Sequence, residues 1–73
     1  MPTLEFFDRE AEVLLNSFAT QSNTTVPVVG DYVEIVDGAD FQSVRAKVSS
    51  RKFFYDAAGT LDKIQLVCTK CKN

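Results

Sequence analysis

The 73-residue sequence contains no histidine and no tryptophan. Without histidine, the chain lacks the commonest general acid and base, the commonest nitrogen ligand for metals and every nucleophile that an imidazole activates. Its three glycines, Gly30, Gly38 and Gly59, stand apart from one another, so there is no glycine-rich loop of the kind that binds phosphate. These absences exclude most enzyme mechanisms, and we expect a protein that is not an enzyme and binds no cofactor.

Long apolar runs and an N-terminal targeting pattern are missing as well. No segment approaches the roughly 18 continuous apolar residues of a membrane helix, and acids occupy the N-terminal region where a signal peptide has bases followed by an apolar run. A chain that is 45% apolar and 25% charged suits one small domain over residues 1–73. We expect a cytoplasmic protein that contacts no membrane.

Charge is distributed unevenly along the chain, although the net charge is only −2. Residues 1–41 hold eight acids and one base, for a charge of −7, whereas residues 42–73 hold seven bases and two acids, for a charge of +5. Strands from the two halves can alternate in one sheet and neutralise each other. The other interpretation is a basic face for an acidic partner such as nucleic acid. We favour neutralisation.

The clearest structural pattern is a hairpin near the C-terminus. Two alternating runs, residues 44–55 and 61–68, flank Asp56-Ala57-Ala58-Gly59, where Asp56 can bond the turn backbone and Gly59 can adopt a positive φ. The alternation predicts two sets of inward side chains that share one core. They are Val44, Ala46 and Val48 on the first run and Ile64, Leu66 and Cys68 on the second.

Ser49 and Ser50 interrupt the first of these runs. Strict alternation after them would bury Lys52, whereas a β-bulge at the serines would bury Phe53 and Tyr55 instead. We predict the bulge, because it buries two rings and supplies the bend that a small closed sheet requires.

In the earlier part of the chain, the sequence pattern predicts secondary structure less clearly. Residues 30–36 predict a strand with Val33 and Ile35 inward, and the polar stretch 16–27 predicts a mobile loop. Residues 9–20 fit either a helix or part of a hairpin. Because residues 7–13 repeat the residue pattern of 55–61 around the predicted C-terminal turn, we favour a hairpin that joins residues 4–7 to 13–18.

These elements predict an all-β fold, a small five-stranded antiparallel barrel or half-open barrel. The alternative is an α+β fold with a helix at residues 9–20 packed on a three-stranded sheet. The sequence PVVGDYVEI at 27–35, followed by VRAKV at 44–48, resembles the opening of SH3-like small barrels, including modules of the KOW type, where a Gly-Asp pair starts a strand. The resemblance implies an SH3-like barrel. Such barrels bind nucleic acids or peptides or serve as assembly subunits.

Bases and aromatic rings alternate in the segment 45–55. Its candidate binding residues are Arg45, Lys47, Arg51, Lys52, Phe54 and Tyr55. Single-stranded nucleic acid is bound by such a combination, because cations contact phosphates while rings stack on bases. The negative net charge favours an ordinary solvated strand face.

The chain's two cysteines form the motif Cys68-Thr69-Lys70-Cys71. A structural zinc needs two further ligands, so zinc would have to be shared between two chains, and a redox pair normally lies at the start of a helix rather than after a strand. We expect Cys68 to be a small core residue, Cys71 to lie in a frayed tail, and no metal to be bound.

The sequence therefore favours a non-enzymatic protein-binding or assembly module, whose partner is another protein or a second copy of the chain in a homo-oligomer. A nucleic-acid-binding barrel that uses residues 45–55 is the alternative. A zinc-bridged dimer through Cys68 and Cys71 is the second alternative.

Overall fold

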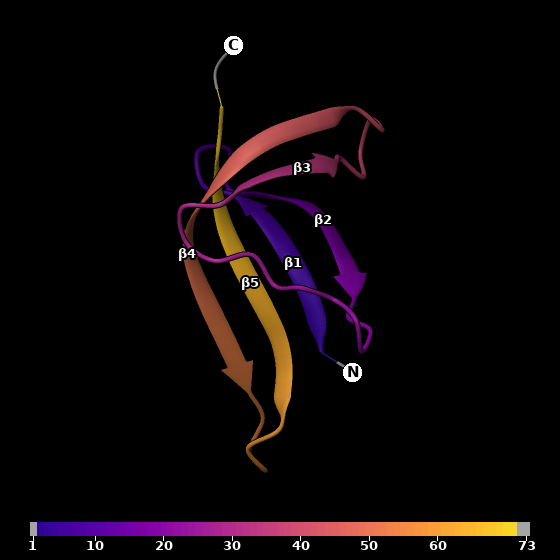
Figure 1. Cartoon of the computed structure of the whole chain (residues 1–73), viewed down its shortest axis with the longest axis vertical. Coiled ribbons are helices and arrows are strands. Elements are labelled where there is room, and N and C mark those ends of the chain that lie inside the picture. Colours follow the sequence, from indigo (N-terminus) through magenta and orange to yellow (C-terminus); the bar gives the residue numbers. More distant parts are fainter. Residues whose placement is uncertain (1, 72–73) are drawn as a thin grey trace.

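The computed structural model describes residues 2–71 and consists of five strands in one sheet (Figure 1). The strands are β1 (Thr3–Asp8), β2 (Val13–Ala19), β3 (Tyr32–Val36), β4 (Ser43–Tyr55) and β5 (Leu61–Lys70). No helix occurs in the described residues, so the all-β prediction is confirmed and the alternative helix at residues 9–20 is wrong. The predicted hairpin forms there instead, with β1 antiparallel to β2. Accordingly, residues 2–71 include no helix with the length and apolar character needed to cross a membrane.

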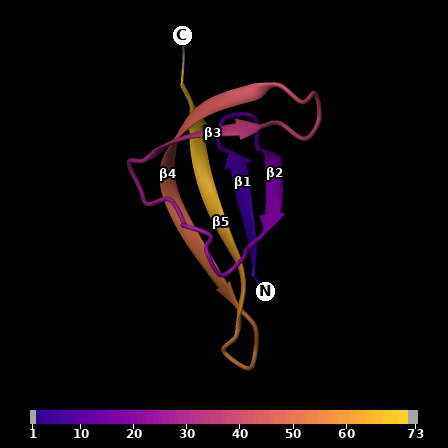
Figure 2. The same ribbon diagram turned by 45° about the vertical axis from the view of Figure 1, so that its right-hand side comes forward.

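The sheet has the order β2-β1-β5-β4-β3 and curls into a nearly closed barrel (Figures 1 and 2). The pairs β1–β2, β3–β4 and β4–β5 are antiparallel, whereas β1 and β5 are parallel. The prediction of a purely antiparallel barrel is therefore wrong. When strands follow chain order around a ring, their directions alternate. An odd number of strands then leaves the first and last running the same way, so five strands require one parallel pair.

The core lies on the concave face of this sheet. Its buried apolar side chains come from all five strands, and they are Leu4, Phe6, Leu15, Ile35, Ala46, Val48, Ile64, Leu66 and Cys68. Val33 and Val44 are half-buried against this cluster. The inward faces predicted for β3, the first half of β4 and β5 are thus confirmed.

Strand pairing also accounts for the uneven charge along the sequence. Three ion pairs occur in residues 2–71, and each joins a base of the C-terminal part to an acid of the N-terminal part. They are Arg45–Glu34 at 2.9 Å, Lys63–Glu5 at 3.6 Å and Lys70–Asp8 at 3.5 Å. The first joins β3 to β4, and the other two join β1 to β5. The predicted mutual neutralisation is confirmed for these pairs.

The bulge in β4 is present, but it does not bury the aromatic rings that follow it. The register with β5 shifts between Val48 and Ser50, and Phe53 then pairs with Ile64 of the core face. Phe53 is nevertheless 42% exposed and Tyr55 62% exposed, so their predicted burial is wrong. The reason is that β3 pairs with residues 43–47 of β4 alone, and the half of β4 beyond the bulge extends past it (Figure 1).

The predicted loop at residues 16–27 is shorter than expected, because β2 continues through Ala19. Thr20 is buried, and its N–H and hydroxyl both donate to the Pro2 carbonyl, at 3.0 and 2.7 Å. From there the chain crosses the front of the barrel to β3 (Figures 1 and 2), and Val26 packs against the core on the way. Mobility of this segment stays a prediction.

Candidate functional site

The barrel is incompletely closed between β2 and β3, a region that we call the open side. Within the described residues, two hydrogen bonds join these strands and the turn after β3. Gly38 N–H donates to the Leu15 carbonyl at 2.9 Å, and Asn16 Nδ2 donates to the Val36 carbonyl at 2.7 Å. Both bonds lie where β3 ends, and within the described residues β2 and β3 form no ladder with each other.

On the β2 edge, backbone polar groups point into this gap. Because Thr20 N–H donates to Pro2, which precedes β1, alternation along the antiparallel pair turns the backbone groups of Ser17 and Ala19 away from β1. Ser17 N–H accordingly bonds the side-chain oxygen of Asn16 at 2.8 Å rather than β1. The carbonyl of Ser17 and both backbone groups of Ala19 face the open side.

The β3 edge presents the same arrangement from the opposite wall. The Asp31 carbonyl accepts a hydrogen bond from Val48 N–H at 2.9 Å, so the backbone of Asp31 faces β4. By alternation, the backbone groups of Val33 and Ile35 face β4 as well. Tyr32 and Glu34 are out of phase with that set, so their N–H and carbonyl groups point away from β4. Two incompletely paired strand edges therefore face one another.

An apolar groove of about 430 Å³ lies between these edges. Leu4 and Phe6 of β1 contribute to its lining, together with Phe18 of β2 and Val36 of β3. Phe18 is half-exposed and packs edge-on against Phe6, with 6.1 Å between ring centroids. Glu34 also lines the groove. The groove thus connects solvent to the buried cluster of the barrel.

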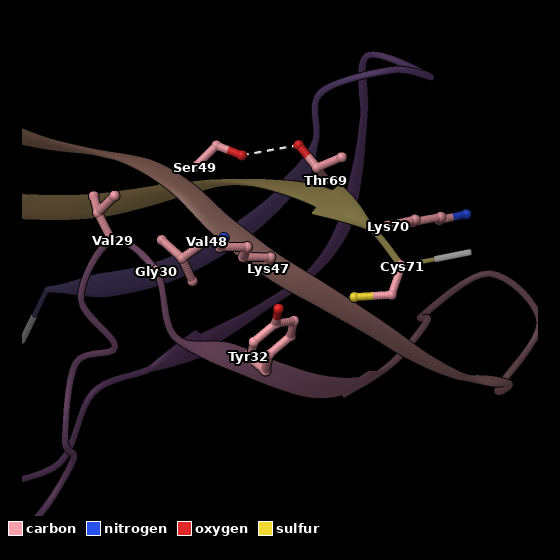
Figure 3. A pocket seen from close by; sticks show the side chains of 9 residues that line it. All are labelled: Val29, Gly30, Tyr32, Lys47, Val48, Ser49, Thr69, Lys70 and Cys71. Atoms are coloured by element: carbon pink, nitrogen blue, oxygen red, sulfur yellow. Dashed lines mark hydrogen bonds between the residues drawn. The ribbon is translucent and has the colours of Figure 1, made fainter. Parts of the chain in front are cut away.

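A second hollow, of about 560 Å³, lies where the bulge of β4 meets the end of β5 (Figure 3). Val29 and the Tyr32 ring contribute exposed apolar surface and Lys47 contributes a cation, whereas Val48 is fully buried and the Lys70 ammonium pairs with Asp8. The Lys47 ammonium lies 5.9 Å from the centroid of the Tyr32 ring. We call this hollow the lysine pocket.

Four of the six predicted binding residues lie on the outer face of β4, among them Arg45, which pairs with Glu34 out of phase with the core residues of this strand. Lys47 pairs with Thr69, Lys52 with Gln65 and Phe54 with Lys63, so these three lie on the outer face. Arg51 pairs with Leu66 and therefore lies on the core face, although its side chain is exposed.

Several of these groups already have partners within the barrel. Arg45 donates to Glu34 through Nε and Nη2, at 3.3 and 2.9 Å, and this hydrogen bonding and the Glu34 charge raise the pKa of Arg45. The Arg51 guanidinium lies 5.3 Å from the centroid of the Phe53 ring. Lys63 lies 4.7 Å from the centroid of the Phe54 ring. Acids and internal contacts thus interrupt the basic segment.

The two cysteines differ sharply in environment. Cys68 is buried, as predicted, and its thiol donates to the Leu66 carbonyl at 3.5 Å. Burial, with a smaller contribution from the Asp8 charge, raises the pKa of Cys68 to about 11. Cys71 is half-buried, and its N–H donates to the Arg45 carbonyl at 2.9 Å, so it is anchored rather than frayed. A zinc ion shared between two chains needs ligands at the surface, so the fully buried Cys68 side chain does not fit a zinc half-site.

Two features were missed at the level of sequence. Asp8 is 2% exposed and accepts from Glu10 N–H at 3.1 Å in addition to its ion pair with Lys70. The alternation of residues along β1 could have indicated this burial, because Asp8 lies two positions after Phe6 and four after Leu4. The other is Phe41, whose side chain is 80% exposed and whose φ is +60°. No pattern in the sequence indicated this conformation.

Comparison of the chain with protein-family models, with curated proteins and with solved structures gave no match. Residues 2–71 also bring together no group of three or more His, Cys, Asp or Glu side chains that could hold a metal ion. The features of the described residues that can contact a partner are the open side, the lysine pocket and the exposed aromatic residues.

Proposed function

We propose that this chain is a non-enzymatic protein-binding or assembly module that receives an extended segment of a partner at the open side. The observation that carries the proposal is the pair of strand edges facing each other across an apolar groove. An extended peptide can hydrogen-bond to such edges through its backbone while alternate side chains enter the groove. Binding of this kind would complete the barrel.

The strand directions define how such a segment would lie. Since β1 and β5 are parallel, and β2 and β4 each run opposite to them, β3 runs opposite to β2. One inserted strand is therefore parallel to one edge and antiparallel to the other. The apolar lining selects a segment with apolar residues at every second position.

An SH3-like barrel of the KOW type remains part of this proposal. The Gly30-Asp31 pair directly precedes β3, in agreement with the position that the resemblance implies. Small barrels of this class include nucleic-acid binders, peptide binders and assembly subunits, so the choice of function rests on the open side and not on the fold.

The edge contact can be tested with peptides selected by the whole chain from a phage-displayed random library. Ala19→Pro removes the N–H that faces the open side without removing a bond to β1, and proline is tolerated on strand edges. Ala19→Val is the matched control, because it keeps this N–H. We expect Ala19→Pro to weaken peptide binding at least about 10-fold and Ala19→Val to leave it unchanged. Unaltered binding by a folded Ala19→Pro variant, or no selected peptide, would overturn the proposal.

Nucleic-acid binding by residues 45–55 is the second candidate, favoured by Lys47 and Lys52, which form no ion pair within residues 2–71. Its test is a single-stranded oligonucleotide titrated at low and physiological salt. We expect no measurable binding at physiological ionic strength, because the chain is net acidic and ion pairs neutralise several bases. Salt-dependent binding, with a slope lowered by up to about two units in the Arg51→Ala, Lys52→Ala double variant, would replace the first proposal.

A further inference from the structure

Phe41 has the most exposed large apolar side chain in the described part of the chain, at 80%. It lies in the loop between β3 and β4, and its φ of +60° is one that bulky residues rarely adopt. A strained conformation of this kind persists only when surrounding contacts determine it, and it is concentrated at functional positions. Phe41 is therefore a candidate contact residue.

Hydrogen bonds hold this loop in one shape. Phe41 N–H donates to the Asp37 carbonyl at 2.8 Å, and Asp37 N–H donates to the Gln42 carbonyl at 2.8 Å. The carboxylates of Asp37 and Asp40 accept from Ala39 N–H at 2.8 Å and Gln42 N–H at 3.0 Å. The loop consequently presents the phenyl ring without the ordering cost that a flexible loop would bear on binding.

The charges around the ring specify the chemistry of the surface that it fits. Asp37 and Asp40 flank Phe41, and neither forms an ion pair within residues 2–71. A complementary site is an apolar hollow with cations at its rim, because opposite charges across an interface attract and like charges repel.

The described residues line several hollows, and their charges distinguish them. One of about 390 Å³ has Arg45 and Lys70 in its lining but also Glu34, which forms an ion pair with Arg45. The groove on the open side has Glu34 in its lining and no lysine or arginine. The lysine pocket has Lys47, apolar surface from Val29 and no acid in its lining, while the Lys70 ammonium at its edge pairs with Asp8 at 3.5 Å (Figure 3). Its Tyr32 ring offers an aromatic contact, and its volume exceeds that of a phenyl ring. The lysine pocket matches the loop and the groove does not.

We propose that Phe41 of one copy inserts into the lysine pocket of a second copy, with Asp37 and Asp40 beside Lys47. The pocket lies near the start of β3 and the loop follows its end, so the two surfaces are at opposite ends of one strand. As proposed, the contact is head to tail, with one insertion between each two copies, so that repetition produces a ring or a filament. It goes beyond the proposed function, because it uses neither the strand edges nor the groove.

Sedimentation velocity of the full chain over a range of concentrations tests this contact. We expect species larger than dimers that dissociate as salt rises, because the charge pairs are exposed. Phe41→Ala and Lys47→Glu should each weaken association at least about 10-fold. Phe54→Ala and Lys52→Glu are the matched controls on β4 and should have little effect.

Mixing the two defective variants gives the sharpest result. Phe41→Ala keeps its lysine pocket and Lys47→Glu keeps its loop, so an equimolar mixture should form a 1:1 complex that grows no further. Monomeric wild type at every concentration, a mixture that stays monomeric, or a Lys47→Glu variant that self-associates normally would each overturn the proposal. Self-association lost in Ala19→Pro but unchanged in Lys47→Glu would place the contact on the open side and overturn it too.

Discussion

The two sides of the barrel differ in how completely their strands are paired. On the closed side, β5 lies between β1 and β4 and contributes Ile64, Leu66 and Cys68 to the core. On the open side, β2 and β3 each have one paired neighbour, and large apolar side chains such as Phe18 remain half-exposed beside them. The difference indicates that the closed side provides most of the stability. The open side retains the backbone and apolar groups that a partner can use.

A matched pair of leucine substitutions tests this division with the largest expected effect. Leu66→Ala on β5 removes a fully buried side chain, and we expect it to lower the free energy of unfolding by about 3 kcal/mol. Leu14→Ala on β2 removes the same atoms from a half-exposed site and should cost less than about 1 kcal/mol. Urea denaturation measures both. Equal losses would mean that the two sides contribute alike.

The cysteines sharpen the comparison, because Cys68 belongs to the closed core while Cys71 lines the lysine pocket. At about pH 8 a thiol reagent should modify Cys71 at least about 100-fold faster than Cys68, which reacts after opening of the core. Rates are measured on the Cys71→Ser and Cys68→Ala variants. Comparable rates would show that the core around Cys68 opens readily.

The same thiol predicts a pH dependence of stability. Burial raises the pKa of Cys68 from its ordinary value of 9.0 to about 11, so the unfolded chain loses this proton at lower pH than the folded chain. The contribution of the Cys68 thiol to the free energy of unfolding is therefore fully present below about pH 9 and is lost as the pH rises through about 11. Cys68→Ala should remove this part of the alkaline decline in unfolding free energy. An identical decline in the variant would contradict the assignment.

Two turn residues with positive φ should respond in opposite directions, by the smallest amounts. Gly59 has φ +84° in the β4–β5 turn, so Gly59→Ala should destabilise by about 1 kcal/mol through backbone strain alone. Phe41→Gly relieves strain in the β3–β4 loop and should be about 1 kcal/mol more stable than Phe41→Ala. Thermal unfolding measures both. A Phe41→Gly variant no more stable than Phe41→Ala would remove the argument from strain.

Local patterns in the sequence predicted much of the closed side. The Asp56–Gly59 turn and the alternation of residues 61–68 are signals within a few positions, and the hairpin follows from them. The parallel pairing of β1 with β5 depends on closure of the whole ring, which no local pattern encodes. Exposure of Phe53 likewise depends on how far β3 extends along β4.

The candidate sites were less predictable for related reasons. Residues 45–55 were selected by composition, but the bulge places Arg51 on the core face, and Glu34 forms an ion pair with Arg45. The open side lies between β2 and β3, the two edge strands of the sheet, and the lysine pocket joins residues from three strands. Phe41 has a positive φ, which is usual for glycine or asparagine, so its residue type did not predict this backbone conformation.

Hydrogen exchange of the free chain, resolved by residue, tests the division between the two sides most directly. We predict that Leu66 N–H, on the central strand of the closed side, exchanges at least about 1,000-fold more slowly than Ala19 and Glu34 N–H, which face the open side. Ile35, whose backbone faces β4, should be slower than Glu34 beside it. Rapid exchange at Leu66, or protection of Ala19 and Glu34 equal to it, would contradict the account.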